Sequence, residues 1–340
     1  MNSERNRFID ALKGLLAIMV VLTHYSWQNG EEQTFLFCYI INFAVPMFIF
    51  ISGYLSAVSF EKKGINSFRE AYSLKVILPK FLRLAIPFTI AFVAEWVIFR
   101  ILGLFEVGII EFGLFAFCID WIKGGYGMGS YYFPIMVQFI FIVPVIFMVV
   151  KAYGKKGLWG CFFANAVFEL LKTAYGMNDY EYRLLFFRYI FVASAGVYLA
   201  LYGARVKNKW LEVVELVIGA GFVYLFTSTG YEPKVLNYWR TTCFPTCLFI
   251  VPIMNFLISK VKRGFLPLEV IGKASFNVFL VQMIYYSTYF EYVNAYVSNY
   301  VLCIVYAVII CVVAGLLFYF AESRITSFVV KKLMVRLNKS

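Results

Sequence analysis

The sequence predicts an all-α, polytopic membrane protein with about ten transmembrane helices and both termini in the cytoplasm. Hydrophobic residues make up 62% of the 340 residues and charged residues only 15%, whereas a soluble domain is close to half apolar. The apolar residues gather into repeated runs of about 20 with few internal charges, which is the length that crosses a bilayer as a helix. A large soluble domain does not fit into the remaining residues.

Ten segments have this character, and we expect each of them to form a transmembrane helix. They are residues 8–28, 35–58, 84–104, 131–150, 158–175, 184–203, 211–229, 241–259, 272–290 and 299–321. The fifth and seventh are the weakest, because Lys172 interrupts the one and Gly219 and Gly221 interrupt the other. The first follows basic residues, as in a signal peptide, but "LTHYSWQNG" after it offers no small-residue cleavage site, so we expect it to be retained.

The basic residues support this number and set the orientation. With a cytoplasmic N-terminus, 24 of the 31 Lys and Arg residues fall in inner segments and 7 in outer ones. Because positive residues collect on the cytoplasmic side, the split favours an even number of spans. The same rule accounts for the net charge of +12, so we expect no nucleic-acid partner. We divide the chain into an integral membrane domain, residues 1–322, and a basic cytoplasmic tail, residues 323–340.

The seven cysteines suggest neither a disulfide framework nor a metal site. Their number is odd, most are flanked by apolar residues, and no pair of them stands near other soft ligands. We therefore interpret them as small buried hydrophobic residues and expect no metal.

The only histidine, His24, ends the first apolar run, and two charges precede it. Lys13 lies 11 residues before His24, close to three helical turns, so both project from one face about 16 Å apart. Asp10 lies three residues before Lys13, on nearly the same face. Ionisable groups within a span usually face a cavity or a partner. Each residue also has a purely structural interpretation. His24 could be hydrogen-bonded to a neighbouring helix near the outer headgroups, and Lys13 could extend to the inner membrane surface. Asp10 could simply pair with Lys13 across one helical turn.

A second set of charges marks the third expected span. Lys80 and Arg83 have an i,i+3 spacing at its cytoplasmic mouth, between Pro79 and Pro87 in "LPKFLRLAIPF". They would meet an anion there, or they simply anchor the span on its positive side. Glu95 lies 12 residues beyond Arg83, roughly 18 Å deeper and at about the depth of His24. It is therefore a candidate to orient the imidazole, the alternative being a pair with Arg100 or a tyrosine.

Several stretches resemble the acyltransferase 3 family of integral membrane acyltransferases. "RFIDALKGLLAIMVVLTH" resembles the family's opening, where a basic residue is followed after ten residues by a histidine, here Lys13 and His24. "VPMFIFISGYLSA" is similar to its second span, with Ser52 in the Ser-Gly pair, and "KFLRLAIPF" to the start of its third, with Lys80 where arginine is more usual. "IGKASFNVFLVQMIYY" resembles a late segment in which Gln282 replaces a frequent second histidine.

The resemblance runs from about residue 7 to 321 and implies an activity. It implies transfer of an acyl group, most often acetyl from acetyl-CoA, to a hydroxyl of a carbohydrate outside the cytoplasm. His24 would be the general base and Glu95 would orient it. Lys13, Lys80 and Arg83 would hold the polyanionic CoA nucleotide at the inner mouth. The partners are then acyl-CoA, a carbohydrate acceptor and the lipid bilayer, and the location is a cell membrane, the inner or plasma membrane of a bacterium.

Other interpretations remain open on the sequence alone. Ser52 either donates a hydrogen bond or, beside Gly53, permits close helix packing. A covalent acyl-histidine is an alternative to base catalysis. A transporter or flippase of a glycan or small molecule has the same composition, although no paired broken-helix repeat is visible. Gln282, in place of the family histidine, keeps open a family member that has lost turnover.

Overall fold

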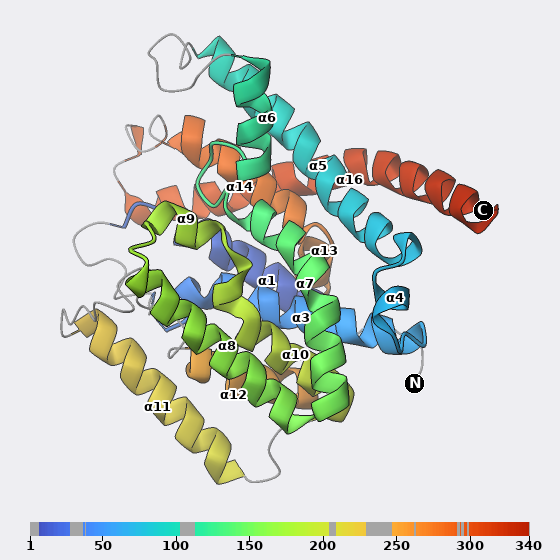
Figure 1. The fold of residues 1–340 in the computed structure, drawn as a ribbon. Coiled ribbons are helices and arrows are strands. Elements are labelled where there is room, and N and C mark those ends of the chain that lie inside the picture. Colours follow the sequence, from blue (N-terminus) through green and yellow to red (C-terminus); the bar gives the residue numbers. More distant parts are fainter. Residues whose placement is uncertain are drawn as a thin grey trace.

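In the computed structural model every regular element of the described chain is a helix (Figure 1). The structure describes residues 7–27, 37, 39–102, 113–203, 209–228, 247–261, 263–290, 293, 296–297 and 299–339. The predicted all-α class is therefore confirmed for these residues.

Each of the ten expected segments overlaps one helix of 13 residues or more. These helices are α1 (Arg7–Thr23), α3 (Ala44–Lys62), α5 (Leu74–Ile101), α7 (Tyr132–Tyr153), α8 (Lys155–Ala174), α10 (Ile190–Tyr202), α11 (Lys209–Ser228), α12 (Cys247–Lys260), α14 (Ser275–Thr288) and α16 (Tyr300–Lys339). Shorter helical pieces join them: η1 (Ile41–Phe43), α4 (Phe68–Ala71), α6 (Leu114–Lys123), α9 (Asp179–Leu184), η2 (Phe186–Tyr189) and α13 (Leu266–Lys273).

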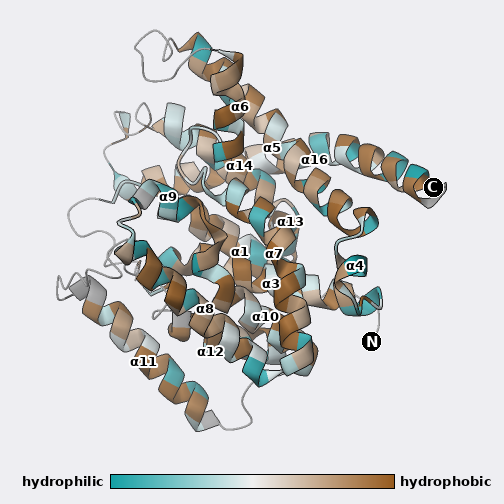
Figure 2. Cartoon of the chain, in the orientation of Figure 1, coloured by the Kyte–Doolittle hydropathy of each residue, from teal (hydrophilic) through white to brown (hydrophobic). Residues whose placement is uncertain are grey.

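The helices have the length and composition of a membrane protein. Among the described residues, four are long and apolar enough to cross a membrane: α3 with η1, α5 with α4, α7 and α16. The pair α13 and α14, bent by 71°, is a fifth if it counts as one broken span. Apolar residues cover most of these helices, whereas α4 and the end of α16 carry hydrophilic ones (Figure 2). The ten spans and the cytoplasmic termini stay predictions.

Close backbone contact between α1 and α13 builds the centre of the molecule. Gly14 and Gly272 face each other where these helices cross, and a Cβ atom on Gly272 would overlap the backbone carbonyl of Asp10. Arg7, at the start of α1, donates to the Glu269 carboxylate of α13 at 2.9 Å. Small residues let helix backbones approach in this way. The crossing therefore fixes where Lys13 of α1 and Lys273 of α13, the residues next to these glycines, lie relative to each other.

The third helix begins earlier than expected. We expected the span to start at residue 84, after a basic loop, but α5 starts at Leu74 and contains both Pro79 and Pro87. Lys80 and Arg83 are thus inside the helix. The expected start at residue 84 was wrong, and the helix can include these charges because both side chains line a cavity of the protein.

The last helix continues across the boundary between the expected membrane domain and tail. α16 is 40 residues long, which makes it about 60 Å, roughly twice the hydrocarbon thickness of a bilayer. Residues 323–339 of the basic tail belong to this helix. The helix is therefore much longer than a single crossing of a bilayer requires.

Candidate active site

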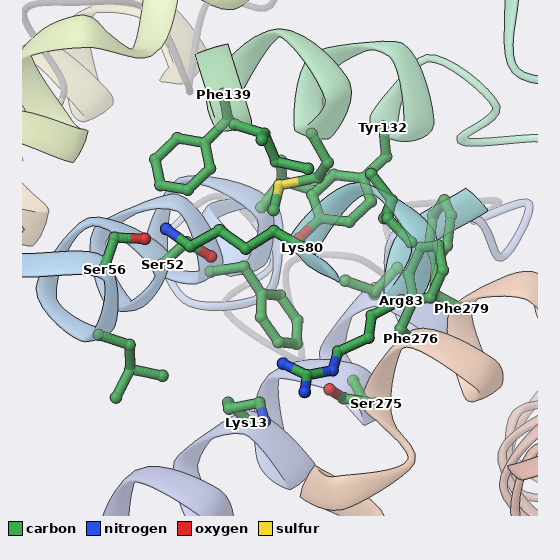
Figure 3. A pocket seen from close by; sticks show the side chains of 18 of the residues that line it. Lys13, Ser52, Ser56, Lys80, Arg83, Tyr132, Phe139, Ser275, Phe276 and Phe279 are labelled. Carbon is green, nitrogen blue, oxygen red and sulfur yellow. The ribbon is translucent and has the colours of Figure 1, made fainter. Parts of the chain in front are cut away.

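A cavity of about 420 Å³ lies between α1, α3, α5, α7 and the junction of α13 with α14 (Figure 3). Four of the predicted site residues line it: Lys13, Ser52, Lys80 and Arg83. Most of its remaining lining is apolar, with aromatic side chains from α7 and α14. Such a cavity, apolar with a few polar groups, is typical of a small-molecule site.

Four cationic side chains line the cavity, and the sequence pointed to three of them. Lys273, at the end of α13, joins Lys13, Lys80 and Arg83. Lys13 lies 3.7 Å from the Asp10 carboxylate, which confirms that ion pair. The buried Nζ of Lys80 lies 4.1 Å from the centre of the Phe60 ring. Within the described chain no carboxylate pairs with Lys80, Arg83 or Lys273, so the cavity has a cationic excess that suits a polyanion.

The start of α14 adds to this positive potential. α13 and α14 meet at a 71° bend, and both Lys273 and Ser275, the first residue of α14, line the cavity. A helix begins with unpaired N–H groups and the positive end of its dipole. Broken helices place such ends at anion sites inside membrane proteins. In Figure 3 the Arg83 guanidinium lies close to Ser275 and Lys13.

His24 lies one helical turn beyond the cavity. Val20 lines the cavity, and His24 follows it by four residues, about 6 Å along α1. The side chain is partly exposed, and its ring lies 6.4 Å from that of Tyr286. The imidazole makes no hydrogen bond with any residue that the structure describes. Its nitrogens are therefore available to a substrate.

A glycine-rich loop, residues 124–130, lies against the imidazole of His24. Gly129 adopts φ +89°, and a Cβ atom there would lie 2.9 Å from His24 Nε2 and 3.1 Å from Phe279 Cε2. Phe279 also lines the cavity. Only glycine combines this backbone conformation with this close approach. The loop backbone thus forms one side of the space around the imidazole.

Glu95 and Gln282 both hold this loop. Glu95 is 2% exposed and accepts a hydrogen bond from the backbone N–H of Tyr126 at 3.3 Å. Gln282 is fully buried, and its Nε2 donates to the backbone oxygen of Met128 at 3.0 Å. Neither residue forms a hydrogen bond to His24 in the described structure. Glu95 therefore holds the loop that lies against the imidazole and does not hydrogen-bond the ring itself.

Comparison with protein families decides what kind of protein holds this site. The sequence profile of the acyltransferase domain of the acyltransferase 3 family matches residues 6–316. The chain belongs to the acyltransferase 3 family. Comparisons with curated proteins and with solved structures find no match. The family and the apolar helices together make the protein a membrane acyltransferase in general terms.

In this acyltransferase the predicted residues fall into two groups. The inner group, Lys13, Ser52, Lys80 and Arg83, lines the cavity. The outer group, His24, Glu95 and Gln282, surrounds the glycine-rich loop. Ser52 faces the cavity, while its neighbour Gly53 makes the close helix contact, against the backbone of Ala193 in α10.

The prediction of single residues missed two parts of the site. Lys273 and Ser275 stand inside the quoted late segment, next to the glycine that packs on α1. Ser56 and Ser59 continue the face of Ser52 at helical spacing, a signal that the sequence does contain.

Proposed function

We propose that the protein transfers an acyl group, acetyl being the first choice, from cytoplasmic acyl-CoA to a hydroxyl of a cell-surface or lipid-linked carbohydrate, in a bacterial cell membrane. One observation carries the proposal. The protein belongs to the acyltransferase 3 family, and its cavity is lined by four cationic side chains. His24, the only histidine of the sequence, lies one helical turn beyond Val20, which lines that cavity. The cations suit the CoA phosphates, and the thioester would then lie toward His24.

The histidine would act as general base in this reaction. His24 removes the proton of the acceptor hydroxyl while that oxygen bonds to the thioester carbonyl carbon. The C–S bond breaks, and the CoA thiolate leaves and takes a proton. The imidazolium of His24 supplies that proton and returns to the neutral form. The loop backbone at Gly129 would border the approach of the acceptor to the ring.

Transfer from a labelled donor tests this function. Purified protein in lipid vesicles is incubated with radiolabelled acetyl-CoA and candidate glycans, and we expect label on the glycan. His24→Ala should lower the rate by at least about 100-fold, the usual worth of a general base, while acetyl-CoA still binds. Full activity of this variant would reject His24 as the base.

Glycan mass spectrometry of cells with and without the gene identifies the acceptor. The expected result is that one glycan loses the mass of an acyl group in cells without the gene.

The vesicle experiment also distinguishes an enzyme from a carrier. Movement of a glycan across the vesicle membrane, without transfer of label to it, would indicate a carrier.

A further inference from the structure

Helix α3 presents three serine side chains to the cavity. Ser52, Ser56 and Ser59 all line it and have the i, i+4, i+7 spacing of a single helix face. They extend over about 10 Å of the helix axis, in steps of about 6 and 4.5 Å. Figure 3 shows Ser52 and Ser56 beside the Lys80 side chain. The remaining neighbours on this side, Leu55 among them, are largely apolar.

These hydroxyls are not used by the fold. Serine and threonine in a helix often return their hydroxyl to a carbonyl of the preceding turn, and this chain contains such cases. Thr89 donates to Ala85 at 2.7 Å and Ser194 to Phe191 at 2.8 Å. Ser52, Ser56 and Ser59 make no hydrogen bond with any described residue. Polar groups beside apolar surface need partners, so theirs come from the contents of the cavity.

The cavity's chemistry selects one kind of ligand. The cations Arg83 and Lys273 and the start of α14 suit phosphate groups. The rest of the cavity suits a slender apolar chain with a few spaced polar groups. The pantetheine arm of CoA is such a chain, because it carries two amides separated by two methylenes. The amides are therefore about 5 Å apart, since the repeat is one bond longer than that of an extended peptide. This distance is close to the steps of about 6 and 4.5 Å between the three serines along the helix axis.

We propose that the pantetheine arm of acyl-CoA lies along the Ser52–Ser56–Ser59 face of α3, and that these hydroxyls hydrogen-bond its two amides. Ser59 lies on the nucleotide side and Ser52 on the side of His24. This inference rests on the proposed function and adds the residues that guide the donor's arm. The apolar groups from α7, such as Met136 and Phe139, cover the methylenes.

Equilibrium binding to the full-length protein in detergent tests the inference. The triple variant Ser52→Ala, Ser56→Ala, Ser59→Ala should raise the Kd of acetyl-CoA about tenfold, which corresponds to about 1.4 kcal/mol. The Kd of adenosine 3′,5′-bisphosphate, which lacks the arm, should stay within about twofold, the precision of the comparison. Ser194→Ala is the matched control, because it removes a buried helical hydroxyl away from the cavity and should change neither constant.

A second variant separates the arm from the nucleotide. Arg83→Ala with Lys273→Ala should raise the Kd of both acetyl-CoA and the bisphosphate. If the serine variant binds acetyl-CoA as tightly as wild type while the cation variant does not, the arm lies elsewhere and the inference is overturned, although the donor site stands. If wild type binds neither probe, the proposed donor fails and the inference with it. Alanine favours helix more than serine does, so the triple variant should fold, and each single variant should show a smaller shift in the same direction.

Discussion

At the scale of the residue, the cations of the cavity decide what binds there. Lys80 and Arg83 project from one helix into it, and neither has a carboxylate partner in the described chain. The Nζ of Lys80 is buried and has no hydrogen-bond partner in the described chain, and a buried charge is costly unless a ligand compensates it. Arg83 is more exposed but lines the same cavity. Their positions are therefore better explained by an anionic ligand than by anchoring of the helix.

Removal of these two charges should weaken donor binding selectively. Lys80→Ala with Arg83→Ala is expected to raise the KM for acetyl-CoA at least about tenfold, since each charge-assisted contact is worth more than a neutral one. The kcat should change little, because the residues do not reach the reacting atoms. Initial rates against donor concentration measure both. Lys123→Ala, at the end of α6 and outside the cavity, is the control; an unchanged KM in the double variant would contradict an inner donor site.

Gly129 should matter to turnover more than to donor affinity. Gly129→Ala places a methyl group 2.9 Å from His24 Nε2 and should lower kcat about tenfold or more, while the Kd of acetyl-CoA stays near that of wild type. Two causes could lower kcat: the methyl group near the imidazole, and backbone strain at a positive φ. Gly64→Ala separates them, because Gly64 also has a positive φ, 65°, but no atom lies within 4 Å of its added Cβ. Rates and binding are measured on the same preparations. Equal loss of activity in both variants would assign the effect to backbone strain.

Single residues were predictable where a motif and a spacing agreed. Lys13, Lys80 and Arg83 were found because charge in an apolar segment demands a reason. Gly129 was not predicted as part of the site. Its contact with His24 joins distant parts of the sequence through a loop, and sequence periodicity does not predict the conformation of a loop. Glu95 was predicted to orient the imidazole, but its hydrogen bond goes to that same loop.

At the scale of the element, the crossing of α1 and α13 supports the site. Gly14 and Gly272 allow the helix backbones to touch, and the adjacent residues Lys13 and Lys273 then share one cavity. Two helices with larger residues at the crossing would move apart. The geometry of the cationic cavity thus depends on two glycines, Gly14 and Gly272.

Gly272→Ala should lower the free energy of unfolding, although Gly→Ala substitutions in helices usually raise it. Gly→Ala in a helix commonly stabilises by up to about 1 kcal/mol, and Gly221→Ala in α11, where the added Cβ has open space, should follow this rule. Gly272→Ala should instead lower stability by about 1–3 kcal/mol through overpacking and weaken acetyl-CoA binding. Thermal unfolding in detergent compares the variants. A raised Tm in both would show that the crossing is loose.

The break between α13 and α14 could not be predicted. The segment from Leu266 to Thr288 is apolar through most of its length and contains Pro267 only near its start. Hydropathy gives no sign of the 71° bend at Ala274. Packing decides it, since Gly272 is held against α1 while α14 packs on α16.

At the scale of the whole molecule, the topology remains to be measured. With ten spans and inner termini, Arg69→Cys in α4 and Lys332→Cys in α16 should react with a membrane-impermeant thiol reagent only in inside-out vesicles. Lys123→Cys, at the end of α6, should react only from outside. The same labelling of a variant without the natural cysteines gives the background. Reaction of Arg69→Cys from outside would reverse the orientation and place the cationic cavity away from the CoA pool.

The start of α14 at the cavity has one more consequence. The partial charge of a peptide dipole carries no proton and no reactive amine. Chemical acetylation of every lysine, or alkaline medium, would therefore leave this partial charge and the Arg83 guanidinium in place. Under the proposed function, the cavity would therefore still attract the donor's phosphates after acyl groups had modified the lysines of the protein.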